Sequence, residues 1–285
     1  MDERGPHDPF DERLEWDRDG QYYHYLTKWM HALSRASSAA KDFTYNRWAM
    51  ELAKTAHARF VYASSPGGPK RMYWKMSIDL SRPLVPSMGH HDPLDGFVTY
   101  NELQATAAKD PEKRKGMDLR AEISDMADIC KGKNWATDDP LGIGGLLFDA
   151  CRVAQLIASG DLEQTGLLET LLESSLIGLD SFAKGNSLKL PVRYRLAFRE
   201  LGLSIGLRAV EKIRELAEQK SGPLRKKDSL HLLLKNLNRY AGLTESIERF
   251  WLERKNREAD TWITYRDINE VMLATSLAPD GFLRL

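Results

Sequence analysis

The apolar residues of this chain recur mostly at intervals of three and four, the spacing that lines one face of an α-helix. Residues 22–38 and residues 45–60 both show this pattern, and a short polar connection separates them. The two segments therefore predict an antiparallel helical hairpin. The same periodicity predicts further helices at residues 99–109, 119–131, 141–159, 162–184, 193–219, 227–241, 244–256 and 265–276.

The helical period is interrupted over residues 64–98. A turn rich in proline and glycine opens this segment, and the polarity then alternates enough to predict a short extended or β excursion near residues 70–82. The prolines and glycines from Pro83 to Gly96 argue against regular structure there. Because Thr99 to Glu102 has the form of a capping box, the next helix is expected to begin at Thr99.

About ten helices joined by short turns, without a run of parallel strands, predict an all-α fold of stacked hairpins. An α/α toroid and an α-solenoid both fit this description. A solenoid shows a sequence repeat of fixed period, and the chain has none, so the toroid is preferred. We expect a single toroid-like domain over residues 1–285, in which residues 1–15 form an extended N-terminal segment dense in charge and proline.

Composition narrows the function. Lys and Arg number 41, as do Asp and Glu, so the net charge of zero gives no general attraction to nucleic acid or to an anionic membrane. Two cysteines are too few for a disulfide framework, and the N-terminus lacks the apolar core of a signal peptide. The apolar stretches are shorter than the roughly 20 residues that cross a bilayer. We therefore expect a cytoplasmic protein without membrane or nucleic-acid partners.

Loop positions group the unusual residues. Consecutive antiparallel helices send alternate connections to opposite ends of the molecule, so loops 14–23, 64–98 and 131–140 are expected at the same end. These loops are rich in aromatic, acidic and histidine side chains. The candidate site residues among them are Trp16, Asp17, Asp19, Tyr22, Trp74, His90, His91, Asp92, Asp95 and Trp135.

Aromatic rings beside carboxylates suit a carbohydrate, because a sugar ring stacks on Trp or Tyr and its hydroxyls bond to polar side chains. Glycoside hydrolysis needs two carboxyl groups across the scissile bond. We expect Asp19 and Asp95 to form this catalytic pair, with His90 and His91 as hydroxyl ligands or proton-transfer groups. The expected substrate-binding residues are Trp16, Asp17, Tyr22, Trp74, Asp92 and Trp135, with Trp16 and Trp74 as the stacking rings.

Structural roles compete with each of these assignments. Asp19-Gly20, Asp92-Pro93 and Asp95-Gly96 are all common turn dipeptides. Adjacent side chains such as those of His90 and His91 point apart, and no third ligand stands at helical spacing, so no metal site is expected. The chain lacks a glycine-rich phosphate loop of the Walker or dinucleotide type, and no cofactor is expected.

Three segments carry a resemblance to a known family: Glu15–Leu33, Tyr45–Trp48 and Gly89–Gly96. They resemble an uncharacterised group within the six-hairpin glycosidase-like superfamily, over much of residues 10–105 and more weakly over 270–285. The resemblance implies an α/α toroid with its active site at one end, formed by hairpin loops. It carries across no catalytic residue.

One departure from that superfamily concerns the start of the chain. A complete toroid needs six helical hairpins, yet this sequence opens on what resembles a loop leading into an inner helix. We therefore expect an incomplete toroid in which the N-terminal hairpin is missing or a homo-oligomer fills its place.

Three functional hypotheses follow. The first is a carbohydrate-active protein, similar to glycoside hydrolases, that binds a small-molecule carbohydrate at one end of the toroid. The second is a sugar epimerase or isomerase that uses histidine acid–base chemistry. The third is a non-catalytic interaction scaffold. The sequence leaves all three open, and with them the question of whether the protein is an enzyme.

Overall fold

A computed structural model describes residues 2–110, 118–219, 222–225 and 227–285 of the chain. The protein is mostly helical, as the periodicity predicted, but a closed α/α toroid is not confirmed. The chain divides into two compact units, Met1–Lys133 and Asn134–Leu285, here called the N-terminal and C-terminal units. The single domain expected over residues 1–285 stays a prediction. Periodicity shows which face of a helix is buried, but it does not show which other helix covers that face.

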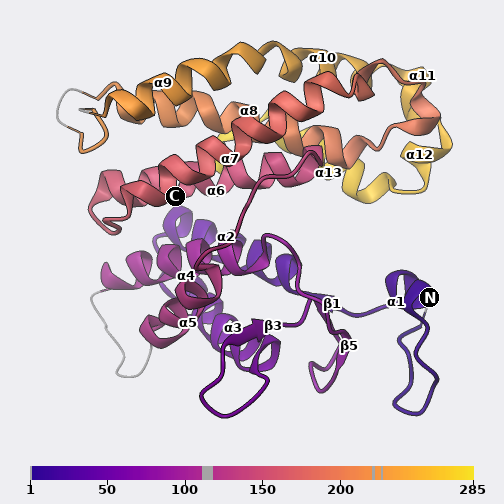
Figure 1. Cartoon of the computed structure of the whole chain (residues 1–285), viewed down its shortest axis with the longest axis vertical. Helices are drawn as coiled ribbons and strands as arrows, with labels where there is room; N and C mark the ends of the chain where they lie inside the picture. Colours follow the sequence, from indigo (N-terminus) through magenta and orange to yellow (C-terminus); the bar gives the residue numbers. More distant parts are fainter. Residues whose placement is uncertain (1, 111–117, 220–221, 226) are drawn as a thin grey trace. The chain divides into compact units, whose positions relative to one another are not determined.

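The N-terminal unit is built around the expected helical hairpin (Figure 1). Helix α2 packs against α3 and α4, and α4 packs against α5. Fully buried side chains such as Met30, Met50 and Leu103 fill the space between these helices. The elements of the unit are α1 Glu12–Asp17, β1 Gln21–Tyr22, α2 Tyr23–Ala40, α3 Thr44–Phe60, β2 Val61–Ala63, β3 Lys70–Met72, β4 Lys75–Met76, β5 Pro83–Val85, α4 Asp92–Ala108 and α5 Arg120–Cys130.

The extended excursion expected near residues 70–82 is confirmed as short strands. Strands β2 and β3 pair as one small antiparallel sheet, and β4 lies between β1 and β5 in another. In the second sheet Gln21 pairs with Met76, and Tyr22 pairs with Lys75. This pairing joins two segments far apart in the sequence, the entrance to α2 and the long connection after α3.

Helix α4 begins at Asp92, about two turns before the start expected at Thr99. Pro93 is tolerated there because the first turn of a helix needs no backbone N–H from it. The side chains of Asp92 and Asp95 lie in the first turn of the helix. The Asp-Pro and Asp-Gly dipeptides that suggested turns therefore start a helix.

The N-terminal segment is also less extended than expected over residues 1–15, because α1 begins at Glu12. The Asp11 carboxylate caps this short helix by accepting hydrogen bonds from the backbone N–H groups of Arg13, at 2.9 Å, and Leu14, at 3.1 Å. A helix of 6 residues is too short to show a hydrophobic period.

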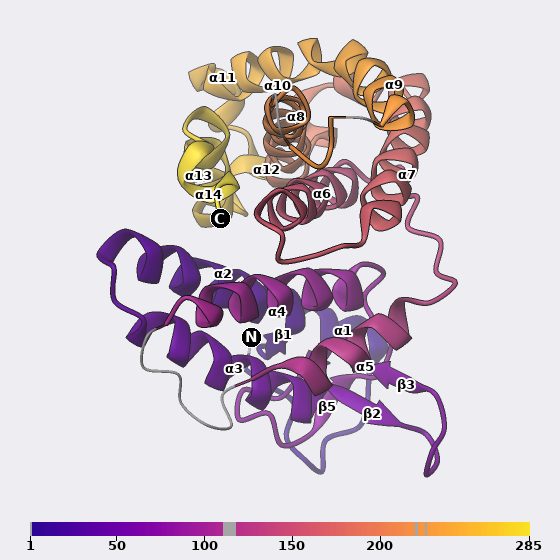
Figure 2. The same ribbon diagram turned by 90° about the vertical axis from the view of Figure 1, so that its left-hand side faces the viewer.

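The C-terminal unit is a separate bundle in which α8 packs against α6, α9, α10 and α13. Figure 2 shows α8 nearly end-on among its neighbours. Its elements are α6 Pro140–Ser159, α7 Thr165–Lys184, α8 Ala197–Ala217, α9 Asp228–Leu237, α10 Gly242–Leu252, α11 Arg254–Arg257, α12 Asp260–Ile263, α13 Arg266–Leu277 and α14 Asp280–Leu283, with 3₁₀ turns at Ser187–Lys189, Val192–Tyr194 and Asn238–Tyr240.

Helix α6 is long and apolar enough to cross a membrane by length and composition alone. However, 72% of its most apolar 18-residue window is buried inside the protein, where it packs against α7 and α8. This is how the core helix of a soluble protein is placed.

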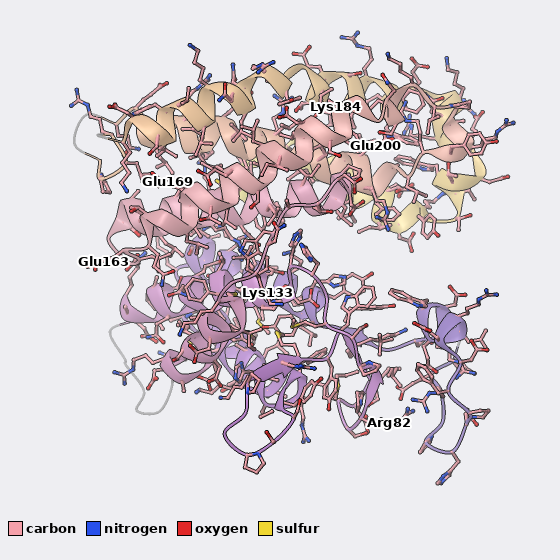
Figure 3. The ribbon with its side chains drawn as sticks, viewed as in Figure 1. Arg82, Lys133, Glu163, Glu169, Lys184 and Glu200 are labelled. Carbon is pink, nitrogen blue, oxygen red and sulfur yellow. The ribbon has the colours of Figure 1, made fainter. Side chains whose placement is uncertain are left out.

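Buried charges in this unit are paired. Glu200, labelled in Figure 3, lies on α8. It accepts hydrogen bonds from Arg195 at 2.8 and 2.6 Å and from the Trp251 indole N–H at 2.8 Å. On α6, Asp149 forms an ion pair with Arg152 at 2.5 Å. Such pairs hold their elements in place because a buried charge without a partner is costly.

The contact between α6 and α8 depends on glycine. A Cβ at Gly144 would overlap the backbone of Gly202, whereas a Cβ at Gly145 would point into open space. We expect Gly144→Ala to lower the free energy of unfolding by about 1–3 kcal/mol through overpacking. Gly145→Ala should raise that free energy by roughly 0.5–1 kcal/mol, because alanine restricts the unfolded chain and favours the helix. Urea unfolding of the two variants measures both effects, and equal changes would contradict this account of the packing.

Candidate functional site

Three aromatic residues predicted as sugar-binding lie together in the N-terminal unit. The ring centroids of Trp16 and Trp74 are 4.3 Å apart, and those of Tyr22 and Trp74 are 5.6 Å apart, both nearly perpendicular. Tyr25 adds a fourth ring, 5.4 Å from Tyr22. We call these four residues the aromatic cluster. Trp16 is 47% exposed and Tyr25 is 55% exposed, so the cluster presents ring surface to solvent.

Backbone pairing brings the aromatic cluster together. Tyr22 in β1 lies opposite Lys75 in β4, so Trp74 stands immediately before the paired residue. The N–H of Tyr23 donates to the carbonyl oxygen of Trp74 at 3.3 Å. The Tyr22 hydroxyl donates to the carbonyl oxygen of Trp16 at 3.3 Å and so holds the end of α1 beside the sheet.

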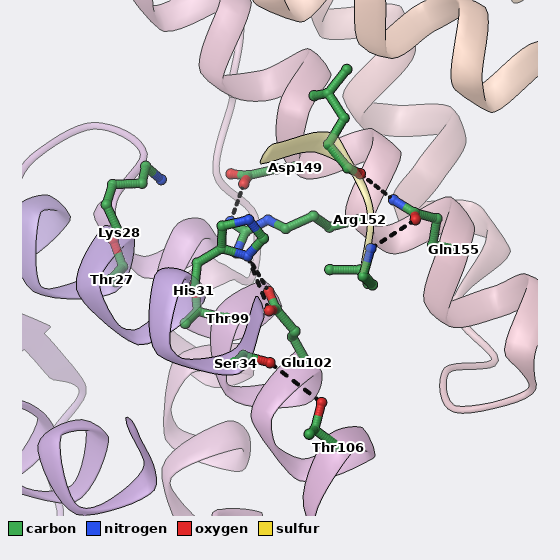
Figure 4. Close-up of polar contacts among 12 residues, drawn as sticks. Thr27, Lys28, His31, Ser34, Thr99, Glu102, Thr106, Asp149, Arg152 and Gln155 are labelled. Atoms are coloured by element: carbon green, nitrogen blue, oxygen red, sulfur yellow. Dashed lines mark hydrogen bonds and ion pairs between the residues drawn. The ribbon is translucent and has the colours of Figure 1, made fainter. Parts of the chain in front are cut away.

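Two carboxyl groups, the acid pair Asp92 and Asp95, lie in the first turn of α4, and each residue is only 6% exposed. The Asp95 carboxylate accepts hydrogen bonds from the Thr27 hydroxyl at 2.5 Å and the Lys28 ammonium at 2.9 Å. The Thr99 hydroxyl adds a longer bond at 3.4 Å. Figure 4 shows Thr27 and Lys28 on α2 and Thr99 on α4. This donor set suits an ionised carboxylate.

Asp92 has a different environment from its neighbour. Burial and the negative charge of Asp95 raise the pKa of Asp92 to about 7, against the opposing effects of Lys28 and of a backbone hydrogen bond from Gly89. His24 approaches it, with the Nδ1 atom 3.8 Å from a carboxyl oxygen. Burial, followed by the charge of Lys28, lowers the pKa of His24 to about 4. Between these two values both groups are neutral, so their contact is not an ion pair.

His24 connects the aromatic cluster to the acid pair. Its ring lies 4.5 Å from that of Tyr25 and 5.5 Å from that of Tyr22, centroid to centroid. His24 is not among the site residues predicted from the sequence. The available signal was its spacing of four residues from Lys28, which places both side chains on the face of α2 that meets the start of α4.

His31 lies on roughly the same face of α2 but has a structural role. Its Nδ1 atom is 2.9 Å from the Glu102 carboxylate, and both side chains are only 2% exposed. The Ser34 and Thr106 hydroxyls form a further contact at 3.3 Å between the same two helices (Figure 4). These groups join α2 to α4 beneath the site.

The expected catalytic aspartates lie on different elements, Asp95 in the first turn of α4 and Asp19 just before β1, and their pairing stays a prediction. Besides burial, the negative charge of Asp95 raises the pKa of Asp92. Asp19 is exposed in the turn before β1, and its charge raises the pKa of Lys75 against the lowering effect of burial. Asp17, at the end of α1, is also exposed, and its charge likewise raises the pKa of Lys75. Within the N-terminal unit, the carboxyl pair is therefore Asp92 with Asp95.

The two adjacent histidines precede the acid pair. The rings of His90 and His91 are 4.5 Å apart, with His90 exposed and His91 half-buried at the N-cap of α4. Trp135 lies in the C-terminal unit and is buried. Loops 14–23 and 64–98 thus come together as expected, while the contribution of Trp135 stays a prediction.

Within the part of the chain that the structure describes, no group of three or more His, Cys, Asp or Glu side chains is placed to hold a metal ion. The chemical groups that the site does offer are one neutral carboxyl, one hydrogen-bonded carboxylate, a neutral imidazole and aromatic rings. Such a site can donate a proton, accept one and stack on a ring.

No known protein family, curated protein or solved structure matches the chain. The resemblance to the six-hairpin superfamily therefore remains a proposal.

The raised pKa of Asp92 predicts how stability depends on pH. The folded protein holds this proton more tightly than the unfolded chain, whose carboxyl has the ordinary pKa of 3.8. The contribution of Asp92 to the free energy of unfolding is therefore fully present below pH 3.8 and is lost as the pH rises toward 7. Relative to the wild type, Asp92→Asn should gain more than about 1 kcal/mol of unfolding free energy between about pH 4.5 and about pH 7.5.

Urea unfolding at the two pH values measures this difference. The lowered pKa of His24 changes stability with pH in the opposite direction, but this effect is common to the variant and the wild type and cancels in the comparison. Asp79→Asn is the matched control. Hydrogen bonds from Ser77 and Ser81 lower the pKa of Asp79 to about 2. Its contribution to the free energy of unfolding is therefore lost only as the pH falls below 3.8, and Asp79→Asn should show a constant difference from the wild type over the tested range. A constant difference for Asp92→Asn would contradict the burial of a neutral carboxyl.

Proposed function

We propose that the N-terminal unit binds a carbohydrate on the aromatic cluster and that the acid pair acts on it as in a glycoside hydrolase. The observation that carries this proposal is that His24 contacts both the aromatic cluster and the acid pair. Its ring packs against Tyr25, which is exposed like Trp16, and its Nδ1 atom approaches Asp92.

The aromatic cluster suits a sugar because its rings offer apolar faces beside polar groups. One face of a pyranose carries C–H groups that stack on Trp or Tyr, while its hydroxyls need donors and acceptors at the rim. Asp17 and the Tyr22 hydroxyl lie on the same short segment as Trp16 and supply such groups. The near-perpendicular rings also leave more than one direction of approach.

The acid pair suits glycosidic cleavage because its members have unequal protonation. Asp92, with a pKa of about 7, holds the proton that a general acid gives to the leaving oxygen. Asp95, held by Thr27 and Lys28, would act as the base or nucleophile. The two carboxyl groups are close enough for the charge of Asp95 to raise the pKa of Asp92.

The unequal environments of the acid pair favour hydrolysis over epimerisation or isomerisation. The acid–base groups of that alternative would be His90 or His91, because burial lowers the pKa of His24 to about 4 and makes it a weak base at neutral pH. The toroid, a cytoplasmic location and a homo-oligomer completing the site remain proposals alongside this function. The scaffold hypothesis is the outcome if no sugar binds.

The stacking role is tested by Trp16→Ala with Trp48→Ala as a matched control. Both rings are about half exposed in the N-terminal unit, at 47% and 52%, but Trp48 lies on α3 outside the aromatic cluster. On a glycan array, followed by calorimetry, Trp16→Ala should weaken sugar binding about tenfold, because a stacked ring contributes on the order of 1 kcal/mol beyond its buried area. Equal losses in both variants would remove the cluster from the proposal.

The catalytic role is tested by Asp92→Asn. Removing a general acid should reduce the turnover of the bound glycoside by about 10²–10⁴-fold while binding is retained. Turnover by the wild type should fall as the pH rises above about 7, because Asp92 then loses its proton. Interconversion of a free reducing sugar without cleavage would instead favour the epimerase or isomerase.

A further inference from the structure

The N-terminal segment, residues 2–18, is attached to its unit in an unusual way, and we call it the strap. Its apolar side chains stay at the surface: Phe10 is 56% exposed, Leu14 37% and Trp16 47%. Glu15 is the one buried residue of the strap. The strap therefore adds no apolar side chain to the buried core.

The buried end of the strap is fixed by a lysine. Lys75 in β4 has no exposed surface, and its ammonium group donates hydrogen bonds to the carbonyl oxygens of Glu15, at 2.7 Å, and Arg18. The same nitrogen lies 4.9 Å from the ring centroid of Tyr22. Backbone oxygens of the strap and an aromatic face thus replace the water that Lys75 loses.

Acidic residues at this end of the chain surround the same cation. Burial lowers the pKa of Lys75, and nearby carboxylates act in the opposite direction. These carboxylates belong to Glu15, Asp19, Asp17 and Glu3. Four of the acidic residues at the N-terminal end of the chain therefore help to stabilise one buried ammonium group.

A second attachment holds the outer end of the strap on the loop between β4 and β5. The Glu3 carboxylate accepts hydrogen bonds from the Ile78 N–H at 2.7 Å and from Arg82 at 2.9 Å. Arg82, labelled in Figure 3, also donates to the carbonyl oxygen of Arg4. Within the strap, Arg4 pairs with Glu15 at 2.7 Å, so the two attachments are linked.

We propose that the strap docks and undocks as one piece, that Lys75 is its anchor, and that docking completes the aromatic cluster by placing Trp16 against Trp74. A segment with few buried apolar contacts opens at low free energy, independently of the core. The polar bonds of the strap are linked through Arg4 and Glu15, so loss of the anchor weakens the whole attachment. Lys75 is thus a positioning residue for Trp16.

Trypsin cleavage after Arg13 and Arg18 in the full chain tests the proposal, because slow cleavage tracks the population of the open form. Lys75→Met keeps the length of the side chain and removes its charge, and we expect cleavage about tenfold faster or more. The matched control is Lys54→Met, which removes another lysine of the unit, paired with Glu122 at 3.0 Å and away from the strap. Equal rates in the two variants would overturn the proposal.

A second variant guards against misfolding of Lys75→Met. Glu3→Gln mainly weakens the outer attachment, where Arg82 is still partly exposed, and removes only the smallest of the carboxylate effects on Lys75. It should speed cleavage about two- to fivefold. Near-ultraviolet circular dichroism adds a direct readout, since undocking separates the coupled indoles of Trp16 and Trp74. The proposal fails if Glu3→Gln leaves both the cleavage rate and this signal unchanged.

The link between docking and ligand binding rests on the proposed function, whereas the cleavage test does not. If sugars bind the aromatic cluster, neutral disaccharides should slow cleavage of the wild-type strap by mass action. Faster cleavage of Lys75→Met without any sugar effect would support the strap and reject the proposed ligand. Sugar binding together with equal cleavage of all variants would support the proposed ligand and reject the strap.

Discussion

When the N-terminal segment closes over Lys75, the ammonium group loses its water, and a buried charge without partners would strongly destabilise the fold. The carbonyl oxygens of Glu15 and Arg18 and the ring of Tyr22 take the place of that water. Lys75 also pairs with Tyr22 across the sheet. Satisfying this one charge therefore fixes the position of the strap, and with it the meeting of Trp16 and Trp74, on which the candidate binding surface depends.

The same strand pairing sets the second half of the site. Strand β1 runs directly into α2, so the register at Tyr22 determines that His24, Thr27 and Lys28 face the first turn of α4. There the two carboxyl groups receive unequal partners: Asp95 has an ammonium group and hydroxyls, whereas Asp92 meets a neutral imidazole. Environment alone thus gives two chemically identical groups different partners.

The C-terminal unit treats its buried acids differently. Glu248 accepts hydrogen bonds from the hydroxyls of Ser204 and Ser276 and from Arg208. Glu200 is similarly held by Arg195 and a tryptophan N–H. Charges paired in this way stabilise contacts between helices. Asp92, buried and beside a like charge, is raised in pKa instead, which is typical of a functional group rather than a structural one.

The sequence by itself determined the mostly helical class, most of the helices, the extended excursion near residues 70–82, and the grouping of loops 14–23 and 64–98. Local periodicity and turn chemistry encode these features. Tertiary structure alone decided the two units, the start of α4 at Asp92, and the burial of Asp92 beside Asp95. An Asp-Pro dipeptide has the same local chemistry in a turn and in the first turn of a helix. Likewise the pKa of Asp92 and the role of His24 depend on burial by a distant segment, which no local pattern records.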